Sequence, residues 1–316
     1  MITILNFRST LRTAIVVLSV VLALVACGES QDVRPDGVSI VATTSIWGDV
    51  AAEIVGDDGT VEVLIPVGSD PHDYLPSARQ IADLHRADLV IANGLGLEEG
   101  LVDVLHAAAD DGVNVYELGP DLDPLPFHGG AISSAVGQDD GELDPHVWFD
   151  PNRVSRAAAA IADRLSEIEP GVDWRSKAES YVSRMRQLDA QIEDLIAAVP
   201  DSNRKLITNH DSLGYFAARY GFTVVGVVIP GGSTLAEPSS AELADLVTTI
   251  QEEGVPAIFA ETTNASVLAE AVAAEAGRGI AVVELYTGSL GPSGSGADTL
   301  ETMLLTDARL IADALS

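Results

Sequence analysis

Short runs of β-branched residues alternate with helical patterns in two stretches of the chain, residues 38–150 and 201–316. In the first, "VSIVATTS" precedes "WGDVAAEIVG"; in the second, "KLITNH" precedes "SLGYFAARYG". Such alternation predicts parallel sheets covered by helices. The intervening residues 151–200 are helical throughout, with a break near Pro170 and one long helix from Trp174. We therefore predict an α/β fold of two lobes, each with a mainly parallel sheet flanked by helices, joined by one long backbone helix.

The first 27 residues differ from the rest in composition. Arg8 and Arg12 precede an apolar run that is short for a membrane span and ends in L-V-A-C at Cys27. This ending resembles the lipobox of bacterial lipoproteins, in which cleavage leaves a lipidated cysteine at the N-terminus. We expect residues 1–27 to be a lipoprotein signal peptide and residues 28–37 a flexible tether. The alternative is an ordinary signal peptide with an incidental cysteine.

Charge and cysteine content exclude several classes of function. The formal net charge is −31, and without residues 1–27, which hold two arginines and no acid, 15 basic and 48 acidic residues leave −33. A chain this acidic is a poor partner for nucleic acid. Cys27 is the only cysteine. The remainder therefore has no intramolecular disulfide and no cysteine-based metal site.

The histidines fall into two groups by position. His85 and His106 lie in predicted helices and are expected to be ordinary surface or packing residues. Ligands of open α/β sheets bind beyond the carboxyl ends of the strands. Four residues with side chains that can bind metal follow predicted strands or loops there: His72, His146, His210 and Glu261. Two belong to each lobe, so we expect them around one cleft. Three imidazoles and an oxygen suit tetrahedral Zn²⁺.

Two readings of these residues stay open. Each loop histidine could merely cap a turn, although three at equivalent strand ends favour a common ligand. The neighbouring carboxylates Asp73, Asp144 and Asp211 could bind the metal. Alternatively, they could orient an imidazole by contacting the ring nitrogen that does not bind the metal.

Three stretches carry a family resemblance: "PVGSDPHDYLPS", "DPHVWFDP" and "TNHDSLGYFAARYG". They resemble motifs of the solute-binding lipoproteins of zinc and manganese ABC transporters, a family that includes proteins first named as streptococcal adhesins. The resemblance implies that His72, His146 and His210 are the first three metal ligands. Manganese-type members commonly have Glu at the position of His210, so histidine there favours zinc, as do three nitrogen donors.

The chain departs from the family pattern at the fourth ligand. The resemblance places Gly288 where the family usually has Asp. Glu261 or a water molecule could fill the position, with Asp298 a weaker candidate. Residues 119–142 occupy the place of a His- and acid-rich loop of zinc-type members. They include His128, Asp139, Asp140 and Glu142. This is either a mobile flap with at most a transient metal contact or a plain loop.

The resemblance implies an extracytoplasmic, lipid-anchored monomer that captures Zn²⁺ in the cleft and delivers it to an ABC permease. On this reading the protein is not an enzyme. Alternatives are a Mn²⁺- or Fe²⁺-binding member of the same family and, less favoured, a zinc hydrolase or an adhesin. A hydrolase would use an open fourth position to activate water, but no H-E-x-x-H motif is present. A siderophore-binding relative would need a basic cleft, and the chain has 17 basic residues in all.

Overall fold

The computed structural model describes residues 37–127, 143–277 and 279–316. The described residues all lie in one compact unit, Asp36–Ser316. The predicted signal peptide, Cys27 and nearly all of the predicted tether fall outside them. So do the flap residues His128, Asp139, Asp140 and Glu142. None of the helices in the described part is long and apolar enough to cross a membrane.

The first sheet has four parallel strands in the order β2-β1-β3-β4. These are β1 (Val38–Ala42), β2 (Gly59–Val63), β3 (Leu89–Ala92) and β4 (Val115–Glu117). All four residues of β3 are buried, as expected for an apolar strand with helices on both faces. The connecting helices are α2 (Ser45–Val55), α3 (Ala78–Leu84) and α4 (Val102–Asp110).

The second sheet repeats this arrangement with the order β6-β5-β7-β8, again fully parallel. Its strands are β5 (Lys205–Thr208), β6 (Thr223–Val227), β7 (Ala257–Glu261) and β8 (Ala281–Leu285). Helices α8 (Gly214–Tyr220), α9 (Ser240–Glu253), α10 (Val267–Ala276) and α11 (Leu300–Leu315) accompany it. The order reverses between β5 and β7, which is where such sheets bind ligands.

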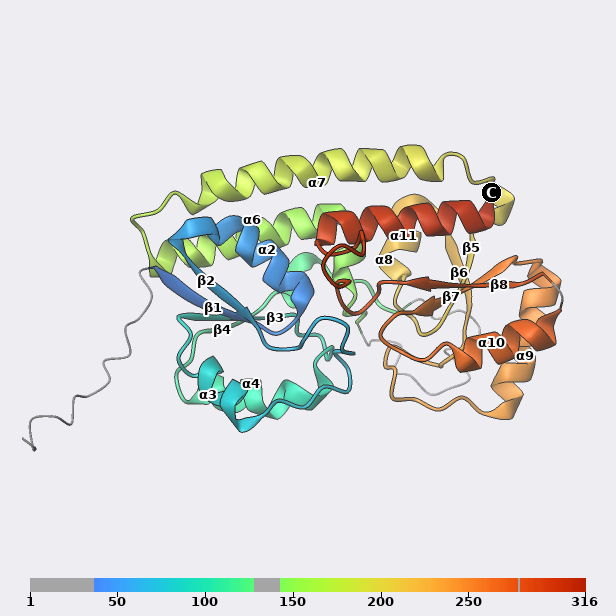
Figure 1. Ribbon diagram of the computed structural model, residues 1–316, viewed down its shortest axis with the longest axis horizontal. Helices are drawn as coiled ribbons and strands as arrows, with labels where there is room; N and C mark the ends of the chain where they lie inside the picture. Colours follow the sequence, from blue (N-terminus) through green and yellow to red (C-terminus); the bar gives the residue numbers. More distant parts are fainter. Residues whose placement is uncertain (1–36, 128–142, 278) are drawn as a thin grey trace, which may run out of the picture. The chain divides into compact units, whose positions relative to one another are not determined.

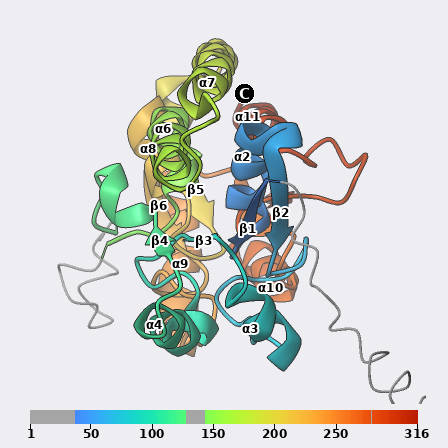
Figure 2. The same ribbon diagram turned by 90° about the vertical axis from the view of Figure 1, so that its left-hand side faces the viewer.

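Two helices connect the sheets, α6 (Pro151–Ile168) and α7 (Trp174–Ile196). With 23 residues, α7 is about 34 Å long, and it ends at Ile196, before the end of the predicted helical stretch 151–200. It packs against α6, α2 and α11, so it touches helices of both predicted lobes (Figure 1). Figure 2 shows α2, α6, α7 and α11 on one side of the sheets and α3, α4, α9 and α10 on the other.

Short polar motifs set where helices begin. After the His72 loop, α3 starts at Ala78, because Ser77 and Gln80 form a capping box. Ser239 and Glu242 do the same for α9. Capping side chains therefore fix the first residue of both helices.

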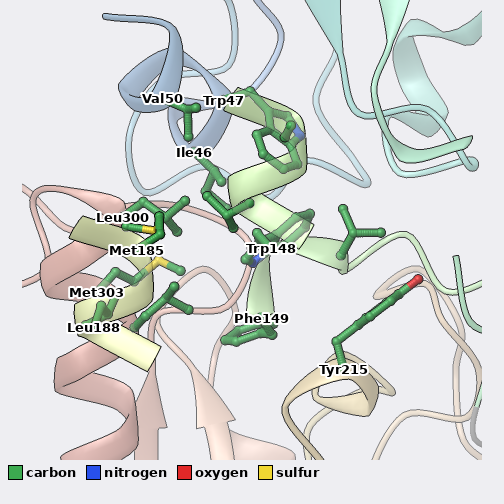
Figure 3. Packing of buried hydrophobic residues seen from close by; sticks show 14 of the residues in the cluster. Ile46, Trp47, Val50, Trp148, Phe149, Met185, Leu188, Tyr215, Leu300 and Met303 are labelled. Carbon is green, nitrogen blue, oxygen red and sulfur yellow. The ribbon is translucent and has the colours of Figure 1, made fainter. Parts of the chain in front are cut away.

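The largest core cluster is continuous between the two sheets. Trp47 and Trp148 meet edge to face with ring centres 6.4 Å apart. Around them pack residues of α2, α7, α11 and the 3-10 turn Val147–Phe149, including Ile46, Val50, Phe149, Met185, Leu188, Leu300 and Met303 (Figure 3). Arg184 of α7 adds ion pairs to Glu53 of α2 and Glu301 of α11. The lobes thus share one core on the α7 side. The predicted lobe bounds, 38–150 and 201–316, stay a prediction.

Candidate metal centre

Three histidines from separate segments meet in the interior. His72 lies in the connection from β2 to α3, His146 immediately precedes the turn Val147–Phe149, and His210 follows β5 by two residues. Their ring centres lie 4.9 to 5.6 Å apart. One ring nitrogen of each lies within 4.8 Å of the others. All three residues are at most 3% exposed. The structure therefore brings together the three histidines that the sequence argument grouped by their positions after strands and loops.

The spacing of the ring nitrogens fits ligands of a single ion. Nε2 of His146 and Nε2 of His210 are 3.0 Å apart. Two imidazole nitrogens on one tetrahedral zinc, each bound at 2.0–2.1 Å, would be about 3.4 Å apart. Nε2 of His72 is buried and has no hydrogen-bond partner among the described residues. Leaving a buried polar atom unpaired costs about 1–3 kcal/mol. A cation bound between the three rings would remove that cost.

Buried carboxylates lie behind two of the three rings. Asp144 Oδ1 is 2.8 Å from Nδ1 of His146 and also accepts the His146 backbone N–H at 2.9 Å. Glu261 Oε1 is 2.5 Å from Nδ1 of His210. A carboxylate beside Nδ1 favours the proton on that nitrogen and leaves Nε2 free to bind a metal. Glu261 ends β7 next to β5, at the point where the strand order reverses.

The other predicted candidates contribute no atom to the group of converging ring nitrogens. Glu261 contacts the back of His210, and the prediction that it is itself a ligand stays a prediction. Asp73 is exposed. Asp298 lies in an exposed turn and accepts the backbone N–H of Gly294 at 3.1 Å. Asp211 is buried beside His210. Gly288 packs against Pro71: a Cβ added to it would lie 2.9 Å from Pro71 Cδ.

His146 is held from both sides of the site. Tyr215 of α8 donates its hydroxyl to the backbone carbonyl of Asp144 at 2.6 Å. Asn93, just after β3, donates from Nδ2 to the carbonyl of Pro145 at 3.0 Å. The Trp148 ring meets the His146 ring edge to face, with centres 5.3 Å apart. The "DPHVW" segment is therefore tied down through its backbone as well as through the imidazole.

Sequence reasoning missed several residues that support the site. Asn93 and Glu99 follow β3, and Glu99 lies 3.4 Å from Nδ1 of His72. Asp70 directly precedes Pro71 and accepts the backbone N–H of His72 at 3.0 Å. Their strand-end positions were a usable signal for Asn93 and Glu99, and the repeated D-P-H pattern was one for Asp70. Tyr215 lies inside a helical pattern, where nothing in the sequence marks it.

The electrostatics of the site favour neutral imidazole at His146. Burial, followed by the positive charge of His210 and His72, holds the pKa of His146 well below its ordinary value. For His210, burial lowers the pKa, but the Glu261 carboxylate and the nearby Asp70 and Asp211 raise it, and the net shift is upward. Burial and the charge of Asp211 raise the pKa of Asp144 well above its ordinary value. A bound metal cation would replace protons at this centre.

Known metal-binding proteins resemble this chain in sequence and in fold. The model of the family described as zinc-uptake complex component A, periplasmic, matches residues 40–314. The manganese-binding lipoprotein MntA of Halalkalibacterium halodurans is 32% identical over 94% of this chain and 96% of its own. The zinc-binding protein TroA of Treponema pallidum is 31% identical over 91% of this chain and 92% of its own. A solved TroA structure superposes with a TM-score of 0.78 at 28% identity, covering 89% of this chain and 99% of that one.

Proposed function

The chain belongs to the family of periplasmic zinc-uptake component A, and we propose that it captures Zn²⁺ for an ABC importer with His72, His146 and His210. The observation that carries this proposal is the convergence of three buried imidazoles, one nitrogen of each within 4.8 Å of the others. No other group of three His, Cys, Asp or Glu side chains with this spacing occurs among the described residues. Delivery to the permease completes the role.

The choice of zinc rests on the donor set. Neutral imidazoles favour zinc, copper and iron, whereas Mn²⁺ prefers carboxylate, carbonyl and water oxygens. Here the three atoms that converge are nitrogens, and the carboxylates of Asp144 and Glu261 contact ring nitrogens. The runner-up is Mn²⁺, because MntA, a manganese-binding relative, is about as similar in sequence as the zinc-binding TroA.

We propose that Glu261 holds His210 in place and that water supplies the fourth donor. Oε1 of Glu261 faces Nδ1, the nitrogen that points away from His146. Direct coordination would require the carboxylate to leave that contact. Glu261→Gln separates the two roles, because the amide oxygen can still accept from Nδ1–H. A positioning role predicts at most about a tenfold loss of zinc affinity for Gln and more for Ala. Equal, large losses for both variants would favour a ligand role.

The cellular setting follows from the sequence and the family. We propose that residues 1–27 are a lipoprotein signal peptide and that Cys27 carries the lipid. The protein would then work as an anchored monomer on the outer side of the membrane, beside its permease. Metabolic labelling with a fatty acid tests this directly. Wild type should incorporate label, and Cys27→Ala should not.

Single histidine variants test the metal site. His72→Ala, His146→Ala and His210→Ala should each weaken Zn²⁺ binding by at least 100-fold, since each removes one of three protein ligands. His106→Ala is the matched control, because His106 is exposed on α4. Binding is measured by competition with chelators of graded affinity. Wild-type zinc affinity in any of the three variants would refute the assignment of that residue.

A further inference from the structure

Asp70 joins the turn that carries His72 to the second sheet. Its side chain is largely buried, at 7% exposure. Oδ1 accepts the backbone N–H of His72 at 3.0 Å. Oδ2 accepts hydrogen bonds from Thr234 Oγ1 at 2.6 Å and from Asn264 Nδ2 at 2.8 Å. We call this set of contacts, Asp70 with Thr234 and Asn264, the Asp70 bridge.

The partners of this turn come from three neighbouring loops. Thr234 lies between β6 and α9, Asn264 lies just after β7, and Gly288 follows β8. Gly288 leaves room for Pro71, since a Cβ there would lie 2.9 Å from Pro71 Cδ. The two residues before His72 are thus held by loops at the carboxyl end of the opposite sheet. The backbone position of His72 depends on both sheets.

The His72 ring is held differently from the other two. Asp144 contacts Nδ1 of His146 at 2.8 Å, and Glu261 contacts Nδ1 of His210 at 2.5 Å. Both carboxylates are buried. The carboxylate near Nδ1 of His72 belongs to Glu99, which is 3.4 Å away and 38% exposed. A partly solvated contact at that distance constrains the ring weakly. The direction of the His72 side chain is therefore set mainly by its backbone, which the Asp70 bridge fixes.

We propose that Asp70 is a positioning residue that couples His72 to the second lobe. While Thr234 and Asn264 hold the carboxylate, Nε2 of His72 stays beside the other two imidazoles. When those loops move away, the His72 turn is released and the ion keeps two protein ligands. Separation of the loops thus weakens the site first at His72 and gives the permease a route to unload it. This inference rests on the proposed function, because it takes His72 to bind the ion.

The double variant Thr234→Val with Asn264→Ala removes both donors to Asp70 and keeps the amino-acid sequence of the His72 turn. We expect zinc affinity to fall by about tenfold or more, as is typical when groups that hold metal ligands are lost. Release of Zn²⁺ to an excess of chelator should accelerate correspondingly. Thr262→Val is the matched control, because Thr262 lies in the same loop as Asn264 with an exposed side chain. Unchanged affinity in the double variant would overturn the proposal.

A double-mutant cycle with His72→Ala separates positioning from a general effect on folding. If the bridge acts through His72, the double variant should cost less than about threefold in affinity once His72 is alanine. In the His106→Ala background the full loss should remain. A loss of equal size in the His72→Ala and His106→Ala backgrounds refutes the coupling. The single variants Thr234→Val and Asn264→Ala enter the same cycle if the double variant unfolds at the assay temperature.

These outcomes differ from a failure of the proposed function. If the histidines do not bind the ion, His72→Ala alone would leave zinc affinity unchanged. If they bind it but the bridge is irrelevant, His72→Ala would weaken binding while the bridge variants would not.

Discussion

Replacing Gly288 by alanine is expected to weaken zinc binding although the new methyl group touches none of the proposed ligands. The added Cβ would lie 2.9 Å from Cδ and 3.4 Å from Cγ of Pro71. Favourable contacts between carbon atoms begin at about 3.5 Å, so the proline ring has to retreat by about 0.6 Å. Pro71 has a fixed φ and is bonded directly to His72. The displacement is therefore passed to the imidazole.

The size of the effect depends on the narrow range of metal–ligand distances. Metal–ligand distances vary by about 0.2 Å between working sites, so a shift of up to about 0.6 Å passed on from Pro71 strains the bond from Nε2 of His72 without removing the ligand. We expect zinc affinity to fall between 10- and 100-fold, or about 1.4–2.8 kcal/mol. Chelator competition measures it, with Ser293→Ala, at an exposed position farther along the same loop, as control. Zinc affinity equal to wild type in Gly288→Ala would show that the close approach to Pro71 does not position His72.

Two further predictions concern stability. Burial raises the pKa of Asp49 from 3.8 to about 6, and the negative charges of Glu53 and Glu301 act in the same direction. The hydrogen bond from the Leu300 N–H and the charge of Arg184 lower this pKa by less. The folded protein then holds a proton that the unfolded chain has lost, so stability should fall by up to about 3 kcal/mol as pH rises from about 4 to 6. Asp49→Asn should remove this loss, and identical pH slopes in urea unfolding would contradict it. Free Zn²⁺ at 100 times its dissociation constant should raise the free energy of unfolding by about 2.7 kcal/mol, and this gain should be absent from thermal scans of His210→Ala at the same zinc concentration.

The fold was predictable because its signals are local. Each strand of a helix-covered parallel sheet is a short apolar run, and each helix has its own periodicity, so β3 and α7 were visible one segment at a time. The four-stranded order repeated in both sheets confirms the two-sheet α/β class. The continuous core around Trp47 and Trp148 was not visible, because residues distant in the sequence build it.

The site was predictable in part for a geometric reason. The loops that follow parallel strands lie at one edge of the sheet, so His72, His146 and His210 could be grouped by position alone. Which ring nitrogen faces a carboxylate is decided by packing, and the contact of Glu261 with Nδ1 of His210 could not be deduced. Asp70 meets Asn264 across 194 residues of sequence, a pairing with no local signal.

Gly288 is interpreted differently from the sequence and from the structure. In the sequence it is a position without the carboxylate that the family pattern leads one to expect. In the structure it is a position where a side chain would collide with Pro71. The absence of a ligand and the close approach of two loops have different physical consequences. The close approach is visible only in the structure.

The most direct test of the account is calorimetric titration of the metal-stripped protein with Zn²⁺ and, separately, with Mn²⁺. We predict tight binding of one Zn²⁺ per chain and much weaker binding of Mn²⁺, with both lost when His72, His146 and His210 are all replaced by alanine. Zinc binding that survives in this triple variant, or no zinc binding by the wild type, would contradict a three-histidine metal centre.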